Sequence, residues 1–542
     1  PGVETTSGPL GQGIGNAVGM AMAEMHLAAR FNQPEFDIFN YHTYVICGDG
    51  DLQEGVAMEA MSLAGHLGLS KLIVLYDSND IQLDGPTNLA FSENIKERFE
   101  AINWDYHLVK DGYDIHEINQ AIIKAKKSNK PSLIEVKTVI GEDSINQGTS
   151  KTHGSPLGLA DRNQIAHKLN WGFEPFVIPE EVYENFQDKV FNRGVDKYNK
   201  YQQMFAEYQE IYPKQAELLN KFYEEEIILD YHELAKLITK DSDATRNVSG
   251  TVINNLSEKY LNIIGGSADL TSSTKAKGAG NHFSKNTPLG RNINYGVREH
   301  AMGAINNGIA LSKALRPFGG AFMVFSDYMK PAIRLAAIMN LPIVYVFTHD
   351  SLQVGEDGPT HQPVEQTLGL RAIPNLNVMR PCDAFETIAS WKIAIESKTT
   401  PTALILTRQN VKNLTTTSYE GVSKGAYIVS KEENKLDGII IATGSEVELA
   451  LATKEILKQN NLDIRVVSMV SQFLFEQQTE EYKNSILPKV KTMSIELGST
   501  LGWYKYADIA FGYDQFGFSA PANKIIEKVG FTAENAAKLF LK

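Results

Sequence analysis

Short runs of aliphatic and β-branched residues alternate with longer stretches of helical periodicity along the whole chain. This alternation is typical of a parallel α/β architecture, because a helix usually returns the chain between two parallel strands. The clearest helix-like stretches are Gly13–Arg30 and Ala57–Leu67. The predicted strands are Tyr44–Cys47, Leu72–Tyr76, Leu133–Val139, Ile263–Ile264, Ile343–Phe347, Val378–Arg380, Ala403–Leu406, Ile439–Ala442, Ile464–Ser468 and Met493–Ile495. The pattern therefore predicts an α/β fold with mostly parallel sheets.

Two changes in composition divide the chain. Residues 180–240 are rich in Glu, Lys, Tyr and Gln with helical spacing and no strand pattern, which indicates helices and a linker that leave a first domain. A polar break at Asn413–Ser418 separates two further α/β blocks. We therefore predict three α/β domains, at residues 1–225, 226–412 and 413–542.

Composition narrows the class of protein. The 542 residues are 43% hydrophobic and 22% charged, as in an ordinary globular protein. The net charge of −13 argues against a sequence-independent nucleic-acid binder. Two cysteines, Cys47 and Cys382, cannot form a disulfide framework, and no apolar run reaches the roughly 18 residues of a membrane span. We expect a reduced, cytoplasmic protein that contacts neither nucleic acid nor membrane.

A Gly-Asp-Gly turn carries the sharpest chemical signal. Gly48-Asp49-Gly50 ends one predicted strand, and Asn79 ends the next. The carboxyl ends of adjacent parallel strands meet at one crevice, where such folds bind ligands. A carboxylate and an amide oxygen suit Mg²⁺, and the glycines allow the backbone to approach a diphosphate. The alternative is an acidic turn followed by an Asn cap.

Two further motifs have a structural interpretation as well as a chemical one. The turn Gly8-Pro9-Leu10-Gly11 runs into a helix of small residues, which can serve helix packing or press backbone against a cofactor ring. Phe322, Phe325 and Tyr328 follow one another at intervals of three, and this spacing alone favours a helical core stripe.

A glycine-broken loop after an apolar strand holds His349, Asp357 and His361. Catalytic groups concentrate in loops at strand ends. An imidazole can shuttle hydroxyl protons near neutral pH, and a carboxylate can bind a sugar hydroxyl. A metal site is the alternative.

Together these segments resemble the transketolase family: the GDG turn followed by Asn, the GPLGQG loop, the HGSPLG loop and the GEDGPTHQPVEQ loop. The resemblance covers essentially the whole chain. It implies a thiamine-diphosphate-binding fold, a C2 homodimer, and thiamine diphosphate with Mg²⁺ (or Ca²⁺ or Mn²⁺ in its place). It also implies an enzyme of the pentose phosphate pathway that reversibly transfers a two-carbon ketol group from a ketose phosphate to an aldose phosphate.

The resemblance assigns the cofactor contacts. Asp49, Asn79 and the carbonyl of Ile81 would hold the metal. Glu299 would be the catalytic carboxylate beside the aminopyrimidine, and we expect burial to raise its pKa. His153 would lie over the diphosphate and count as catalytic with His361. The other cofactor-binding residues would be Gly8, Leu10, Gly48, Gly50, Glu54, Asp269 and the aromatic residues Phe322, Phe325 and Tyr328, which stack on the pyrimidine across the dimer interface.

The resemblance also assigns the substrate contacts. His361 and Asp357 would face the reacting hydroxyls, and His349 would reach the phosphate. Arg246, Ser273 and Arg408 match the family's phosphate-binding residues, a role that suits the planar fork of arginine. Where the family usually has Pro before this serine, Ser272 stands here.

The family also has a helical segment with active-site histidines before the position of Pro1. We expect this segment to precede Pro1 in the encoded protein, and ketol transfer to be severely reduced without it. The rival from another class is a homologue that folds and dimerises as a scaffold without turnover. Among enzymes, a deoxyxylulose-phosphate synthase or a pyruvate-type decarboxylase would share only the GDG turn, the Asn and the catalytic Glu. The last block predicts packing and dimerisation rather than chemistry.

Overall fold

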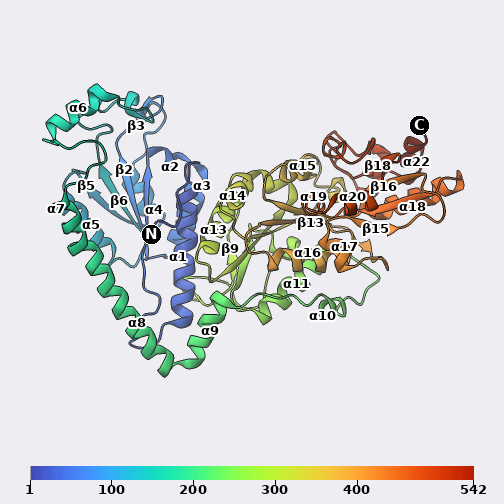
Figure 1. Ribbon diagram of the computed structural model, residues 1–542, viewed down its shortest axis with the longest axis horizontal. Coiled ribbons are helices and arrows are strands. Elements are labelled where there is room, and N and C mark those ends of the chain that lie inside the picture. The colour runs from blue at the N-terminus through green and yellow to red at the C-terminus, as the bar shows by residue number, and fades with distance from the viewer. Residues whose placement is uncertain (1) are drawn as a thin grey trace. The chain divides into compact units, whose positions relative to one another are not determined.

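The computed structural model describes residues 2–542, and the chain divides into two compact units, residues 1–225 and 226–542 (Figure 1). Each unit combines helices with mostly parallel strands, so the predicted α/β fold is confirmed. The further division at residue 412 remains a prediction.

The first unit is built on a four-stranded parallel sheet with strand order β1-β2-β6-β5. Its strands are β1 (Thr43–Gly48), β2 (Leu72–Ser78), β5 (Asp105–Val109) and β6 (Ser132–Lys137). Helix α5 (Ile115–Ala125) packs on this sheet through Ala121 and Ala125, which form a core with Ile73 and Ile134. Helix α1 (Gln12–Phe31) is buried along most of its length, as its small side chains allow, and packs against α3 (Gly55–Leu67).

The helices predicted for residues 180–240 are present. The helices of this stretch that belong to the first unit are largely exposed. One of them, α8 (Arg193–Ile211), contacts α1 through the Tyr208 hydroxyl, which donates to the carbonyl of Phe31 at 2.8 Å. The other elements of this unit are α2 (Asp49–Gln53), β3 (Ile81–Gln82), β4 (Gly85–Pro86), η1 (Thr87–Leu89), α4 (Ile95–Ala101), η2 (Ser150–Thr152), α6 (Leu159–Lys168), α7 (Glu180–Phe186), η3 (Gln187–Asn192) and α9 (Pro213–Glu224).

The second unit contains two larger sheets. The first is parallel, with the order β12-β13-β11-β10-β8-β9. Its strands are β8 (Ile263–Ser267), β9 (Asn292–Asn294), β10 (Arg316–Phe322), β11 (Val344–Thr348), β12 (Asn377–Met379) and β13 (Thr402–Leu406). The helices beside it include α11 (Thr245–Lys259), α13 (Glu299–Leu311), α14 (Ser326–Ile338) and α16 (Ala384–Glu396).

Strand β10 lies between β8 and β11, yet the sequence pattern did not predict it. Its sequence RPFGGAF contains a proline and two glycines, which disfavour strands. Tertiary packing explains the exception at Gly320, where a Cβ would lie only 2.3 Å from the Cβ of Ala276. A strand that packs this closely needs glycine.

The second sheet of this unit has the order β15-β17-β16-β18-β19, with only β15 antiparallel. It consists of β15 (Tyr427–Ser430), β16 (Gly438–Ala442), β17 (Ile464–Ser468), β18 (Thr492–Ile495) and β19 (Ile509–Phe511). The remaining elements are α10 (Tyr231–Ala235), β7 (Ser242–Asp243), α12 (Thr271–Thr274), η4 (Met323–Phe325), η5 (Leu352–Val354), α15 (Gln366–Arg371), β14 (Val411–Lys412), α17 (Tyr419–Ser423), α18 (Glu446–Gln459), α19 (Gln472–Glu476), α20 (Glu480–Ile486), η6 (Leu501–Trp503), α21 (Ala522–Val529) and α22 (Ala533–Leu541). One hydrophobic core includes residues from both sheets, such as Val346 and Ile440.

Both cysteines are buried and free. Within residues 2–542, none of the helices is long and apolar enough to cross a membrane.

Candidate functional site

Asp49 and Asn79 lie together at the carboxyl edge of the first unit's sheet. Strands β1 and β2 run in parallel, with Gly48 opposite Asp77, so the residues that follow them share this edge. The backbone N–H of Asn79 donates to Asp49 Oδ2 at 3.3 Å, and the Tyr76 hydroxyl donates to Asp49 Oδ1 at 2.6 Å. The Ile81 amide donates to Asn79 Oδ1 at 3.1 Å, which brings Ile81 to the same place.

The electrostatics at Asp49 fit a cation. Its side chain is buried, and burial raises the pKa of the carboxyl above its ordinary value. Hydrogen bonds from Tyr76 and Asn79 lower this pKa, but they offset the effect of burial only in part. The nearby carboxylates of Asp77 and Asp80 raise it further. A divalent ion among these oxygens would offset both effects. The described residues contain no group of three His, Cys, Asp or Glu side chains that could hold a metal, so such an ion would also need amide or carbonyl oxygens and phosphate.

The two glycine motifs of this unit are joined by Asp51, which the sequence analysis missed. Its carboxylate accepts from the Gly11 amide at 2.7 Å and from the Gly48 amide at 2.9 Å. A Cβ on Gly50 would lie 2.8 Å from Cδ1 of Leu10, whereas a Cβ on Gly48 would enter open space. The GDG turn therefore has room beside its backbone for a bound group, with Leu10 packed against it.

Glu54 and His153 border this edge in different ways. Exposed Glu54 is the C-cap residue that follows α2, and its Cβ lies 2.9 Å from where a Cβ on Gly11 would stand. His153 is half-buried after η2, in the loop that leaves β6. Because Ser78 and Lys137 are opposite each other in the parallel pair β2 and β6, this loop starts at the same edge as Asn79.

The second unit collects its predicted residues at one strand edge as well. In the parallel ladders, Phe322 lies opposite Thr348, and Thr348 lies opposite Leu406. The residues that follow these strand ends therefore share one edge. With β8 and β9 in the same parallel register, this edge holds Asp269 after β8, Glu299 after β9, Phe322 at the end of β10 with Phe325 and Tyr328 after it, His349 after β11 and Arg408 after β13.

The aromatic residues do not form a helical stripe. Phe322 ends β10, Phe325 belongs to η4, and Tyr328 is in α14, so the helical interpretation of their spacing is wrong. Instead, the rings of Phe322 and Phe325 are stacked 6.2 Å apart, and Phe325 lies 5.3 Å from His361, edge to face. Tyr328 is 63% exposed. The result is an aromatic wall next to the two histidines.

His349 joins this wall to the predicted phosphate residues. Its Nε2 lies 3.4 Å from Nη1 of Arg246, and Nη1 of Arg246 also donates to the carbonyl of Ser273 at 2.9 Å. Because arginine can only donate, Nε2 accepts, so the neutral ring carries its proton on Nδ1 and donates to Thr348 Oγ1 at 2.8 Å. Burial, followed by the charges of Arg246 and Arg408, lowers the pKa of His349 to about 3. The imidazole is therefore neutral at physiological pH.

Other predicted residues are more open. Glu299 is half-buried at the start of α13, which is held to α14 because Asn307 donates to the carbonyl of Ala332 at 3.0 Å. Asp269, Asp357 and Arg408 are exposed. Exposed charged groups beside an aromatic wall suit a ligand that enters from solvent.

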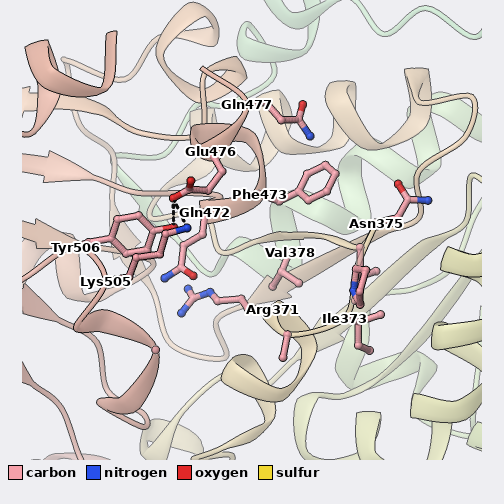
Figure 2. Close-up of a pocket in the computed structure, with 14 residues that line it drawn as sticks. Arg371, Ile373, Asn375, Val378, Gln472, Phe473, Glu476, Gln477, Lys505 and Tyr506 are labelled. Carbon is pink, nitrogen blue, oxygen red and sulfur yellow. Dashed lines mark hydrogen bonds and ion pairs between the residues drawn. The ribbon is translucent and has the colours of Figure 1, made fainter. Parts of the chain in front are cut away.

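A cavity of about 450 Å³ lies elsewhere in the second unit (Figure 2). It is lined by residues of α15, α19 and η6 and their neighbours, among them Arg371, Phe473 and Tyr506. None of the predicted site residues lines it.

Comparisons with known proteins agree along the chain. Family models match in three segments: "Transketolase, thiamine diphosphate binding domain" at residues 1–227, "Transketolase, pyrimidine binding domain" at 241–413, and "Transketolase-like TK C-terminal domain" at 425–532. The chain is 51% identical to the transketolase of Bacillus subtilis, over 98% of this chain and 82% of that protein.

Solved structures give the same picture. Transketolase from Leishmania mexicana has a TM-score of 0.94 and 43% identity, covering 99% of this chain and 81% of that one. Three structures of transketolase from Pichia stipitis, two of them mutants, each have a TM-score of 0.93 and 42% identity over 99% of this chain and 81% of theirs. Those are complexes with sedoheptulose 7-phosphate, fructose 6-phosphate and xylulose 5-phosphate.

Proposed function

The chain belongs to the transketolase family of thiamine-diphosphate-dependent transferases, and we propose that it moves a two-carbon ketol group between phosphorylated sugars with the two clusters described above. The observation that carries this assignment is the convergence, at strand edges, of an acidic glycine turn in one unit and of arginine, histidine and aromatic side chains in the other.

In this proposal the first unit holds the diphosphate end of the cofactor. Asp49, the side chain of Asn79 and the carbonyl of Ile81 bind Mg²⁺, and the open backbone at Gly48 admits the diphosphate. Leu10 packs beside the turn, and His153 covers the diphosphate from the β6 loop.

The second unit receives the pyrimidine and the sugar. Thiamine diphosphate, when bound, supplies the carbon nucleophile of the reaction. Glu299 holds a proton for the pyrimidine ring, and Phe322, Phe325 and Tyr328 form the wall on which this ring stacks. His361 takes a proton from a reacting hydroxyl of the sugar, and Asp357 binds a sugar hydroxyl.

Phosphate recognition falls to Arg246, Ser273, His349 and Arg408. The guanidinium of Arg246 is already held by the carbonyl of Ser273 and by Nε2 of His349, so a phosphate here meets a prearranged cationic donor. The three Pichia stipitis complexes support sugar phosphates as substrates of this chain. We further propose a cytoplasmic homodimer that works in the pentose phosphate pathway.

The test is ketol transfer by the full-length protein. With thiamine diphosphate and Mg²⁺, xylulose 5-phosphate and an aldose phosphate should give a ketose that is two carbons longer than the acceptor. Calorimetry should show cofactor binding in the same sample. Cofactor binding without transfer would favour the scaffold alternative. Absence of both would contradict the placement of the cofactor.

A further inference from the structure

The turn that carries His349 has an unusual backbone. His349 has φ of 65°, in the left-handed region that residues other than glycine rarely adopt. The side chains of His349 and Asp350 are both buried. A strained residue of this kind persists only where its neighbours hold it, so the groups that hold this turn matter for the position of the imidazole.

The next residue, Asp350, is anchored by one arginine. Its Oδ2 accepts from Nη2 of Arg380 at 2.7 Å and from Nε of Arg380 at 3.1 Å. Both side chains are 1% exposed. Because a buried ion pair cannot exchange its partner for water, this contact restrains Asp350 closely.

Arg380 is in turn held by residues at the ends of strands in the sheet β15-β17-β16-β18-β19. Its Nη1 is hydrogen-bonded to Glu446 Oε2, donates to the carbonyl of Thr443 at 3.1 Å, and lies 3.6 Å from Glu496 Oε1. Glu446 begins α18, and Glu496 follows β18. Gly444 packs over the guanidinium so closely that a Cβ there would lie 2.8 Å from its Cζ. Burial lowers the pKa of Arg380, but Glu446, Asp350 and Glu496 together raise it above its ordinary value.

A second arginine completes the cluster. Arg371 donates to both oxygens of Glu496, at 2.7 and 2.9 Å, and Trp503 Nε1 donates to Glu496 at 2.7 Å. Arg371 lies on the wall of the cavity drawn in Figure 2. A chain of ion pairs therefore runs from the wall of this cavity to the residue next to His349. Its members are Arg371, Glu496, Arg380 and Asp350.

We propose that Arg380, held by Glu446 and Glu496, is a positioning residue that fixes His349 through Asp350 for contact with the substrate phosphate. This inference rests on the proposed function, because it gives His349 the phosphate role stated there. It assigns a task in substrate specificity to the C-terminal block, for which the sequence predicted only packing and dimerisation.

The first test uses Asp350→Asn, which keeps the shape of the side chain and removes the charge that pairs with Arg380. We expect KM for xylulose 5-phosphate to rise roughly five- to tenfold, while kcat changes less than about twofold. KM for unphosphorylated xylulose should stay unchanged. Arg380→Lys, which keeps the charge but loses the planar fork, should give a smaller rise. A loss of folded enzyme alone would lower kcat for both donors and leave both KM values in place.

Glu432→Gln is the matched control. Glu432 accepts from the buried Arg465 at 2.7 and 2.9 Å in the same C-terminal block. The substitution should lower the thermal midpoint much as Asp350→Asn does, but leave the ratio of the two KM values unchanged. A changed ratio in this control would overturn the inference.

His349→Ala and the double variant with Asp350→Asn distinguish the phosphate role of His349 from the positioning role of Arg380. If His349→Ala leaves the KM ratio unchanged, the phosphate role of His349 in the proposed function is wrong. If it raises the ratio, Asp350→Asn should have no further effect in its background. Additive effects in the double variant, or no effect of Asp350→Asn alone, would overturn the positioning role.

Discussion

The ring of Phe322 lies against the imidazole of His349, with the ring centroids 3.8 Å apart and an angle of 30° between the planes. The contact between Phe322 and His349 thus joins the aromatic wall to the predicted phosphate-binding residues. The contact also keeps water from one face of the imidazole, and this burial is the main reason for the lowered pKa of His349.

The first prediction follows from this pKa. The folded-state pKa of His349, about 3, lies below its ordinary value of 6.5, so the unfolded chain binds the proton first as the pH falls. Its contribution to stability is therefore complete above pH 6.5 and is lost toward pH 3, by at most about 1.4 kcal/mol per pH unit. His349→Asn should flatten this slope in urea unfolding. The exposed His232→Asn serves as the control and should leave the slope as in the wild type.

The second prediction concerns the metal. Asp49→Asn should weaken Mg²⁺ binding at least tenfold in titration calorimetry, because it removes the buried carboxylate. The wild-type affinity should fall as the pH is lowered toward the raised pKa of Asp49, since protons then compete with the ion. Asp84→Asn, on the exposed turn between β3 and β4, should bind as the wild type does. Unchanged affinity in Asp49→Asn would place the metal elsewhere.

The third prediction concerns Glu299. Glu299→Gln is nearly isosteric, so the thermal midpoint and the binding of thiamine diphosphate should stay within the wild-type range. Ketol transfer should fall by at least about a hundredfold, as expected when a proton-transfer group is lost. Wild-type turnover in this variant would remove Glu299 from the mechanism.

The fourth prediction separates specificity from chemistry. Arg246→Ala or Arg408→Ala should weaken the apparent binding of phosphorylated donors by about 1.5–3 kcal/mol, the value of a charged hydrogen bond. Unphosphorylated donors should change much less. Arg334→Ala, an exposed arginine of α14, is the control. Equal losses for both kinds of donor would contradict a phosphate role.

The fifth prediction concerns assembly. Light scattering after gel filtration should give twice the mass of the chain. Tyr328→Ala should weaken cofactor binding, because this exposed ring belongs to the predicted pyrimidine wall. A stable, active monomer would contradict the proposed homodimer.

Much of the cluster proposed to bind Mg²⁺ could be predicted from the sequence. The carboxyl ends of parallel strands share an edge, so Asp49 and Asn79 had to lie near each other once β1 and β2 were adjacent. Tyr76 and Asp51 were not predicted as partners of these motifs, although their hydrogen bonds hold Asp49 and the two glycine turns. A tyrosine within a strand and an acid within a short helix carry no sequence signal that shows which way they point.

The sequence by itself determined the α/β class, most of the strands and the residue types available to the site, because these depend on local periodicity and on motifs within short segments. Only the tertiary structure decided that RPFGGAF is a central strand, since Gly320 serves close packing against Ala276 rather than local strand preference. Only the tertiary structure joined Asp350, Arg380 and Glu446, which lie 30 and 66 residues apart along the chain. In the sequence each of these is one charged residue among many. Burial explains why they pair, because a charged group inside a core is stable only next to an opposite charge.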